Sequence, residues 1–206
     1  MPPNRRRYRR PLGERRYRKL FIIATEGVKT EPQYFATFND HHSVIHVDCI
    51  KSKHRSSPLQ VLKRMEDRLK QKNLENSDEA WLVVDKDQWT DEQLIQLHTW
   101  SQGADNYGFA LSNPKFEYWL LLHFEDGTNI GSASECSDRL KKHLPDYNKG
   151  LDIRKITPDM IENAIRRAKI RDSPPCEDWP RIFGSTTVYK LVENILSERP
   201  DRKSVV

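Results

Sequence analysis

The chain has 206 residues, 36% of them hydrophobic and 32% charged, which suffices for one domain with a small appendage and leaves two equal domains out. Its longest apolar runs fall far short of the roughly 20 residues that a membrane span needs, so we predict no membrane-spanning segment. The basic N-terminal segment lacks the apolar region of a secretory signal, and the three cysteines show no C-x-x-C spacing, so we predict a cytoplasmic protein with reduced thiols.

The first 18 residues predict a basic, flexible arm. Residues 1–19 carry nine Lys or Arg and a single Glu, whereas the net charge of the whole chain is only +5, so the rest of the chain is mildly acidic. Such arms commonly neutralise nucleic-acid phosphates. The arginines that we expect to do so are Arg5, Arg6, Arg7, Arg9, Arg10, Arg15 and Arg16. The alternative is a solvated tail that aids solubility or folds against an acidic partner.

The next part of the chain alternates between strand and helix patterns. Short apolar runs with β-branched residues predict strands over residues 19–25, 44–50, 79–87 and 107–111. Capping residues and apolar stripes predict helices that begin near Thr30, Ser57, Thr90 and Ser112. This alternation predicts an α/β core over residues 19–127, with a mostly parallel four-stranded sheet flanked by helices.

Beyond Gly127 the pattern predicts helices only. We expect them over residues 132–143, 158–169 and 185–197, separated by loops that contain proline. Residues 128–206 should therefore form a helical extension packed on the core.

Acidic residues follow three of the predicted strands. Glu26 comes after the first strand, Asp85 and Asp87 end the third, and Glu117 lies just past the fourth. The carboxyl ends of parallel strands meet at one edge of a sheet, which is where ligands bind. Asp85 and Asp87 are two residues apart in an extended segment, so their side chains point the same way with Cα atoms about 6.6 Å apart.

Carboxylates this close repel one another unless a cation lies between them, and hard oxygen ligands suit Mg²⁺ or Mn²⁺ better than zinc. Mg²⁺ usually leaves several positions to water and substrate phosphates. The pattern therefore predicts a metal site for phosphoryl transfer or phosphodiester hydrolysis. The alternative is that a strand simply ends in an acidic turn.

Four blocks of sequence resemble the RloB-like family. They are FIIATEGVKTEPQYF at residues 21–35, VVDKD at 83–87, LSNPKFEYWLLLHF at 111–124 and STTVYKLVE at 185–193. That family is similar to Toprim domains, in which a glutamate after the first strand and an Asp-x-Asp after a later strand organise Mg²⁺. The resemblance therefore implies a Toprim-like fold, and an association with bacterial anti-phage loci that often contain an ATPase partner.

By position, Glu26 matches the Toprim glutamate, and Asp85 and Asp87 match the Asp-x-Asp. The resemblance thus implies that Asp85 and Asp87 hold the cation while Glu26 is a general acid/base or a further ligand. The Toprim strand often continues Asp-x-Asp-x-x-Gly, but Gln88, Trp89 and Thr90 follow here. The glycine turn is absent, which puts the loop geometry in question.

Several neighbours of these acids are further candidates. Lys29 is a candidate to neutralise a phosphate and Glu31 to reach a second metal; the alternatives are a loop lysine and an acid favoured by a helix N-terminus. Ser112 and Asn113 flank the fourth strand and are candidate helix caps. Glu117 is a candidate to bind metal or to orient Lys115.

A second basic cluster comprises Lys51, Lys53 and Arg55. It is a candidate to follow a phosphate backbone, with a solvated loop as the equal alternative.

The function that we expect is a Mg²⁺- or Mn²⁺-dependent nuclease that cleaves tRNA or DNA in anti-phage defence. The resemblance also implies control by an AAA/ABC-type ATPase partner, and we expect a homo-oligomer. The alternative is a non-catalytic nucleic-acid-binding or regulatory subunit. A nucleotide phosphotransferase is disfavoured because the sequence has neither G-x-x-x-x-G-K-[ST] nor G-x-G-x-x-G.

Overall fold

The structure is a computed structural model that describes residues 19–39, 45–51, 57–86, 89–147 and 151–198. The predicted arm, with all of its candidate arginines, lies outside the described residues. So do Asp87, Lys53 and Arg55. No helix in the described part of the chain is long and apolar enough to cross a membrane.

A five-stranded sheet forms the centre of the molecule, with strand order β2-β1-β3-β4-β5. The strands are β1 Lys19–Thr25, β2 Ile45–Cys49, β3 Glu79–Asp85, β4 Tyr107–Asn113 and β5 Ser185–Thr186. The first four are parallel, and β5 is antiparallel to β4. The predicted α/β class and mostly parallel sheet are therefore confirmed.

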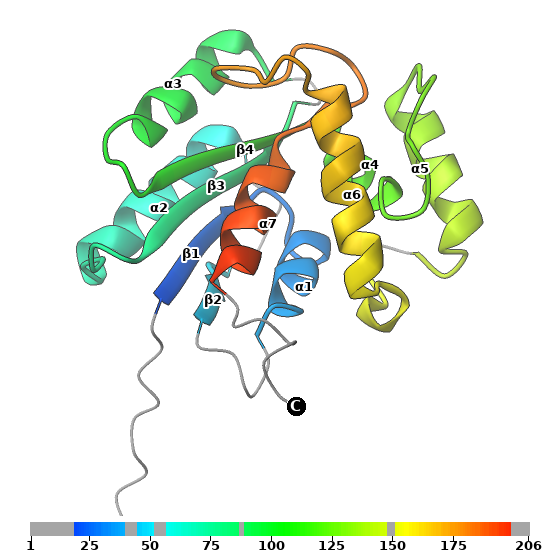
Figure 1. The fold of residues 1–206 in the computed structure, drawn as a ribbon. Coiled ribbons are helices and arrows are strands. Elements are labelled where there is room, and N and C mark those ends of the chain that lie inside the picture. The colour runs from blue at the N-terminus through cyan, green and yellow to red at the C-terminus, as the bar shows by residue number, and fades with distance from the viewer. Residues whose placement is uncertain (1–18, 40–44, 52–56, 87–88, 148–150, 199–206) are drawn as a thin grey trace, which may run out of the picture.

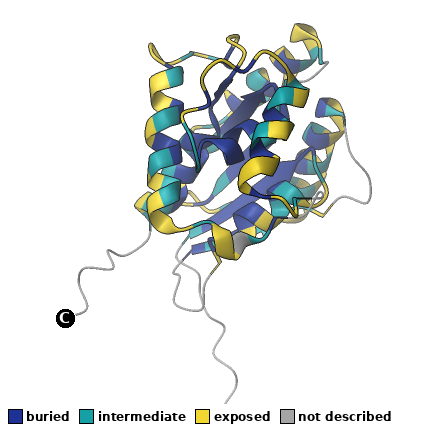
Figure 2. Ribbon diagram, turned by 90° about the vertical axis from the view of Figure 1, so that its right-hand side faces the viewer, coloured by how far each residue is buried: buried dark blue, intermediate teal, exposed yellow. Residues whose placement is uncertain are grey.

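Helices cover both faces of this sheet (Figure 1). They are α1 Thr30–Ala36, α2 Pro58–Gln71, α3 Asp91–Ser101, α4 Phe116–Leu121, α5 Ala133–His143, α6 Pro158–Arg171 and α7 Val188–Ser197, with a 3₁₀ turn at Ile153–Lys155. One buried cluster joins the sheet to α2 and α3, and a larger one joins its other face to α1 and to α4–α7. In Figure 2 the strands are buried and the outer faces of the helices are exposed.

The period-2 geometry of strands explains the two clusters. In β1, Ile22 and Ala24 contribute to the cluster with α2 and α3, while Phe21 and Ile23 contribute to the other. A strand that is buried on both faces reads as a continuous apolar run, and this is why β1 and β3 are visible in the sequence.

The sheet has five strands and not the four that we predicted. Residues 185–197 were expected to be one helix, but Ser185–Thr186 form β5 and α7 begins at Val188. The Thr186 hydroxyl lies 2.9 Å from the hydroxyl of Ser112 on β4. A two-residue strand is too short to show alternation, so its tertiary partner and not its own pattern decides its structure.

One predicted helix start also differs from the structure. The fourth strand continues through Asn113, the Asn113–Pro114 peptide is cis, and Lys115 is the N-cap of α4, so neither Ser112 nor Asn113 caps that helix. Pairing with β5 extends the strand to this point. The first helix does begin at Thr30, but its N-cap is Lys29 and not Thr30 itself.

Candidate functional site

A pocket of about 490 Å³ lies where β3 ends and α1 and α4 begin. We call it the acid pocket, after the carboxylates in its lining. Three acids and three lysines line it: Glu31, Asp85, Glu117, Lys29, Lys115 and Lys141. The carboxyl edge of the sheet thus brings together residues that are far apart in the sequence.

Asp85 is the last residue of β3 and is buried, with 7% of its surface exposed. Its Oδ1 accepts a 2.8 Å hydrogen bond from the backbone N–H of Phe116, at the start of α4. Burial raises the pKa of Asp85 well above its usual range, and the charges of Glu31, Glu26 and Glu117 raise it further. The ionised form of Asp85 is therefore unfavourable unless a positive charge lies beside it.

Glu26 follows β1 but does not belong to the lining of the acid pocket. It is almost fully buried, and its Oε2 accepts hydrogen bonds from the Asp85 backbone N–H at 3.3 Å and from the Trp89 indole N–H at 3.1 Å. Glu26 therefore joins the end of β1 to the end of β3 and to the segment that follows it.

Glu31, in the first turn of α1, does line the acid pocket. Its Oε1 accepts a 2.9 Å hydrogen bond from the Gly27 N–H. Burial raises the pKa of Glu31 to about 7, and the charges of Glu117 and Glu26 act in the same direction. A Cβ atom at position 27 would lie 2.0 Å from Glu31 Oε2, so this arrangement requires glycine.

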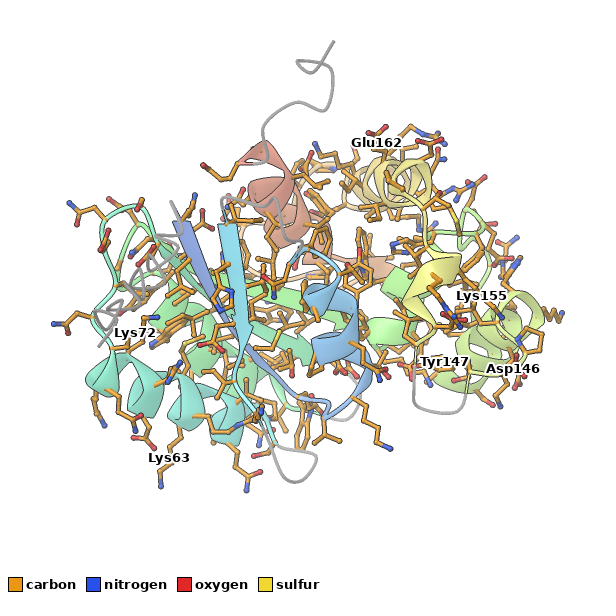
Figure 3. The ribbon with its side chains drawn as sticks, turned by 90° about the horizontal axis from the view of Figure 1, so that it is seen from below. Lys63, Lys72, Asp146, Tyr147, Lys155 and Glu162 are labelled. Carbon is orange, nitrogen blue, oxygen red and sulfur yellow. The ribbon has the colours of Figure 1, made fainter. Side chains whose placement is uncertain are left out.

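Glu117 is only partly buried and accepts a 3.1 Å hydrogen bond from the Tyr147 hydroxyl. That hydroxyl also lies 3.2 Å from the Thr30 hydroxyl, so Tyr147 connects α4 to α1 across the pocket. Tyr147 is labelled in Figure 3. Sequence reasoning missed this residue, because it lies in a loop 30 residues after Glu117 and belongs to no motif.

The lysines of the pocket supply positive charge. Lys115 donates a hydrogen bond to the Ser137 hydroxyl on α5 rather than contacting Glu117. Lys29 is exposed at the N-terminus of α1. Neither Ser137 nor Lys141 was predicted, because nothing in the sequence of α5 distinguishes a pocket wall from an ordinary polar helix face.

The remaining predicted residues lie elsewhere. Ser112 pairs with Thr186, and the Asn113 side chain donates to the Arg181 carbonyl at 3.1 Å, so both hold the β5 segment. Lys51 lines a separate pocket beside α2.

The acid pocket partly fits a divalent cation. Its donors are hard carboxylate oxygens, and neighbouring carboxylate charges help to raise the pKa of Asp85 and of Glu31, a repulsion that a cation would relieve. Among the described residues, however, no three His, Cys, Asp or Glu side chains lie close enough to hold one metal ion. The donor chemistry and the charge fit Mg²⁺ or Mn²⁺, with one or two protein ligands and the rest from water and substrate.

A family model described as RloB-like protein matches residues 21–195. Comparisons with curated proteins and with solved structures found no match.

Proposed function

Because the chain belongs to the RloB-like protein family, we propose that it is a metal-dependent nuclease that hydrolyses phosphodiester bonds of tRNA or DNA, on a Toprim-like fold. The observation that carries this proposal is the acid pocket. Three carboxylates and three lysines line one cavity at the carboxyl edge of a parallel sheet. Acids that bind a cation and lysines that bind phosphate oxygens are what such a reaction requires.

In this proposal Asp85 and Glu31 hold a Mg²⁺ or Mn²⁺ ion, and Asp87 is a further ligand implied by the family resemblance. The ion, when bound, would lower the pKa of a water molecule and neutralise the charge of the phosphate. Glu26 is a positioning residue, because it binds the backbone N–H of Asp85. This assignment differs from the Toprim resemblance, in which Glu26 itself takes part in chemistry or metal binding.

The other lining residues act on the substrate. Lys29, Lys115 and Lys141 bind the phosphate oxygens and stabilise the charge that develops on them. Glu117 orients the attacking water and accepts its proton, while the Tyr147 hydroxyl holds the carboxylate in place through its hydrogen bond.

The family resemblance supports a wider role. We propose that the nuclease acts in the cytoplasm in anti-phage defence, under the control of an AAA/ABC-type ATPase partner and as a homo-oligomer. The arginines of residues 1–18 would bind nucleic acid outside the acid pocket.

A second candidate function is a non-catalytic nucleic-acid-binding or regulatory subunit. Two observations favour it: the Glu26 carboxylate already binds two protein donors, and within the described residues no three ligands converge on one point.

Cleavage assays separate these two functions. Purified protein should cut at least one of tRNA, single-stranded DNA and duplex DNA when Mg²⁺ or Mn²⁺ is present. Asp85→Asn keeps an acceptor for the Phe116 N–H but loses the charge, so we expect cleavage to fall more than the roughly 100-fold caused by losing an outer contact of a metal site. Glu162→Gln is the matched control, because Glu162 is exposed on α6 (Figure 3).

Absence of cleavage by the wild type, even with a cognate ATPase added, would contradict the nuclease proposal. Nucleic-acid binding that persists under those conditions would support the regulatory subunit instead.

A further inference from the structure

A second pocket, of about 400 Å³, lies between the end of β2 and the side of α2. We call it the β2–α2 pocket; three cations, Lys51, Arg64 and Arg68, line it together with Asp48 and Asp67. Asp48 is paired with Arg68 at 2.5 Å, and Asp67 lies 3.4 Å from Lys70. Both acids of the pocket therefore lie beside a cation, whereas Lys51 and Arg64 have no carboxylate partner among the described residues.

Arg64 is fixed in place without a carboxylate partner. Its Nη2 donates to the Thr25 carbonyl at 2.6 Å and its Nε to the Gln60 carbonyl at 3.4 Å. The third nitrogen, Nη1, is buried and has no hydrogen-bond partner. No ion pair of Arg64 or of the exposed Lys51 occurs in the described part of the chain. A half-buried guanidinium in this state is stabilised by any anion that reaches it.

The β2–α2 pocket is adjacent to the acid pocket. The carbonyl that holds Arg64 belongs to Thr25, the residue before Glu26. Cys49, which also lines the β2–α2 pocket, lies close enough to Glu31 for the Glu31 charge to contribute to raising the pKa of its thiol, after burial and Asp48. Both pockets therefore lie at the carboxyl edge of the sheet, one beside β2 and the other beyond β3.

We propose that the β2–α2 pocket binds a backbone phosphate of the same nucleic acid whose scissile phosphodiester occupies the acid pocket. This inference rests on the proposed function and extends it: the protein contacts a second phosphate of the substrate in addition to the one that is cut. A polynucleotide carries a phosphate on every nucleotide, so a single strand can present one phosphate to each pocket. Lys51 and Arg64 bind this second phosphate, and Arg68 holds Asp48 away from it.

Binding assays on the full chain in EDTA test this proposal without cleavage. The probe is a short, labelled single-stranded oligonucleotide, titrated at several salt concentrations. We expect Lys51→Gln and Arg64→Gln each to weaken binding several-fold and to reduce the slope of log K against log[salt] by about 0.7. Lys63→Gln, an exposed residue on the same helix outside the pocket (Figure 3), should leave both quantities unchanged.

Wild-type affinity and slope in both variants would overturn the proposal. Lys51 is exposed, so its variant tests the pocket even if Arg64→Gln disturbs the contact with Thr25. Thermal stabilisation by inorganic phosphate that is lost in Arg64→Gln, with unchanged oligonucleotide binding, would identify a free-phosphate site and contradict the polynucleotide assignment. Loss of affinity in a protein that cuts nothing would support the phosphate site and contradict the nuclease.

Discussion

At the scale of single residues, Gly27 and Glu31 form the arrangement in the acid pocket that leaves no room for a larger side chain at position 27. The sequence shows both in one block, but it cannot show which carboxylate of the block faces the pocket, because that depends on how the loop after β1 turns. Glu26 turns toward Asp85 and Trp89, while Glu31 bends back to the Gly27 N–H and lines the pocket. Glu31, which we expected only to reach a second metal, therefore lines the acid pocket, whereas Glu26 does not.

We expect Gly27→Ala to displace the Glu31 carboxylate. The new Cβ would lie 2.0 Å from Glu31 Oε2, and the end of a flexible side chain can move aside, so the loss of stability should stay near 1 kcal/mol. Mn²⁺ affinity, measured by calorimetry, should fall about 10- to 100-fold.

The matched control for this substitution is Gly131→Ala. Gly131 also donates its N–H to a glutamate four residues later, Glu135, but a Cβ there would lie 3.6 Å from that carboxylate. Unchanged Mn²⁺ affinity in Gly27→Ala would show that Glu31 takes no part in metal binding.

At the scale of elements, the long segments could be predicted and the short ones could not. The apolar runs of β1 and β3 and the capped amphipathic α2 show clear periodicity, because one or two faces are buried along their whole length. The two-residue β5 and the six-residue α4 depend on contacts with distant segments. The structure of residues 185–187 therefore depends on their pairing with β4.

A substitution of Thr187 tests how much the contact between residues 185–187 and β4 stabilises the fold. The buried hydroxyl of Thr187 accepts a 3.0 Å hydrogen bond from the Leu111 N–H on β4. Thr187→Val keeps the shape of the side chain and leaves that N–H without its acceptor, so the free energy of unfolding should fall by about 1–3 kcal/mol in urea denaturation. Thr99→Val, at an exposed position of α3, is the control. Equal losses in both variants would contradict a specific role for the Leu111 contact.

At the scale of the whole molecule, the free energy of unfolding depends on a hydrophobic core that contains a histidine, His123, in its neutral form. His123 is 2% exposed in the larger cluster; its Nδ1 lies 3.0 Å from the Trp119 carbonyl, and its Nε2 lies 3.2 Å from the Tyr34 hydroxyl. Because a carbonyl only accepts, Nδ1 donates there. Nε2 of the neutral ring then accepts from Tyr34.

This histidine should make unfolding depend on pH. Burial lowers its pKa to about 4, from 6.5 in an unfolded chain. Between these values the unfolded state binds the proton more readily, so the contribution of His123 to stability falls as pH falls from 7 toward 4, by about 2 kcal/mol at pH 5. The buried acids Glu31 and Asp85 change stability in the opposite direction, since their pKa values are raised.

The comparison with His123→Gln isolates this effect, because the acids are common to both proteins. Urea denaturation at pH 7 and pH 5 should show that acidification is less unfavourable to the variant than to the wild type, by about 2 kcal/mol. An identical effect of pH on both proteins would mean that His123 binds a proton as readily in the native core as in the unfolded chain.

The antiparallel pairing of β5 with β4 has a consequence for synthesis. A ribosome completes the three acids of the acid pocket at residue 117, and Tyr147 soon afterwards, well before it adds residues 185–186. Until then the outer edge of β4, including the Leu111 N–H, has no partner strand, and an exposed strand edge invites association with other chains. The nascent protein therefore passes through an interval in which the acids of the pocket are made but the edge of β4 is still unpaired. A chaperone that covers this strand edge would be most useful during that interval.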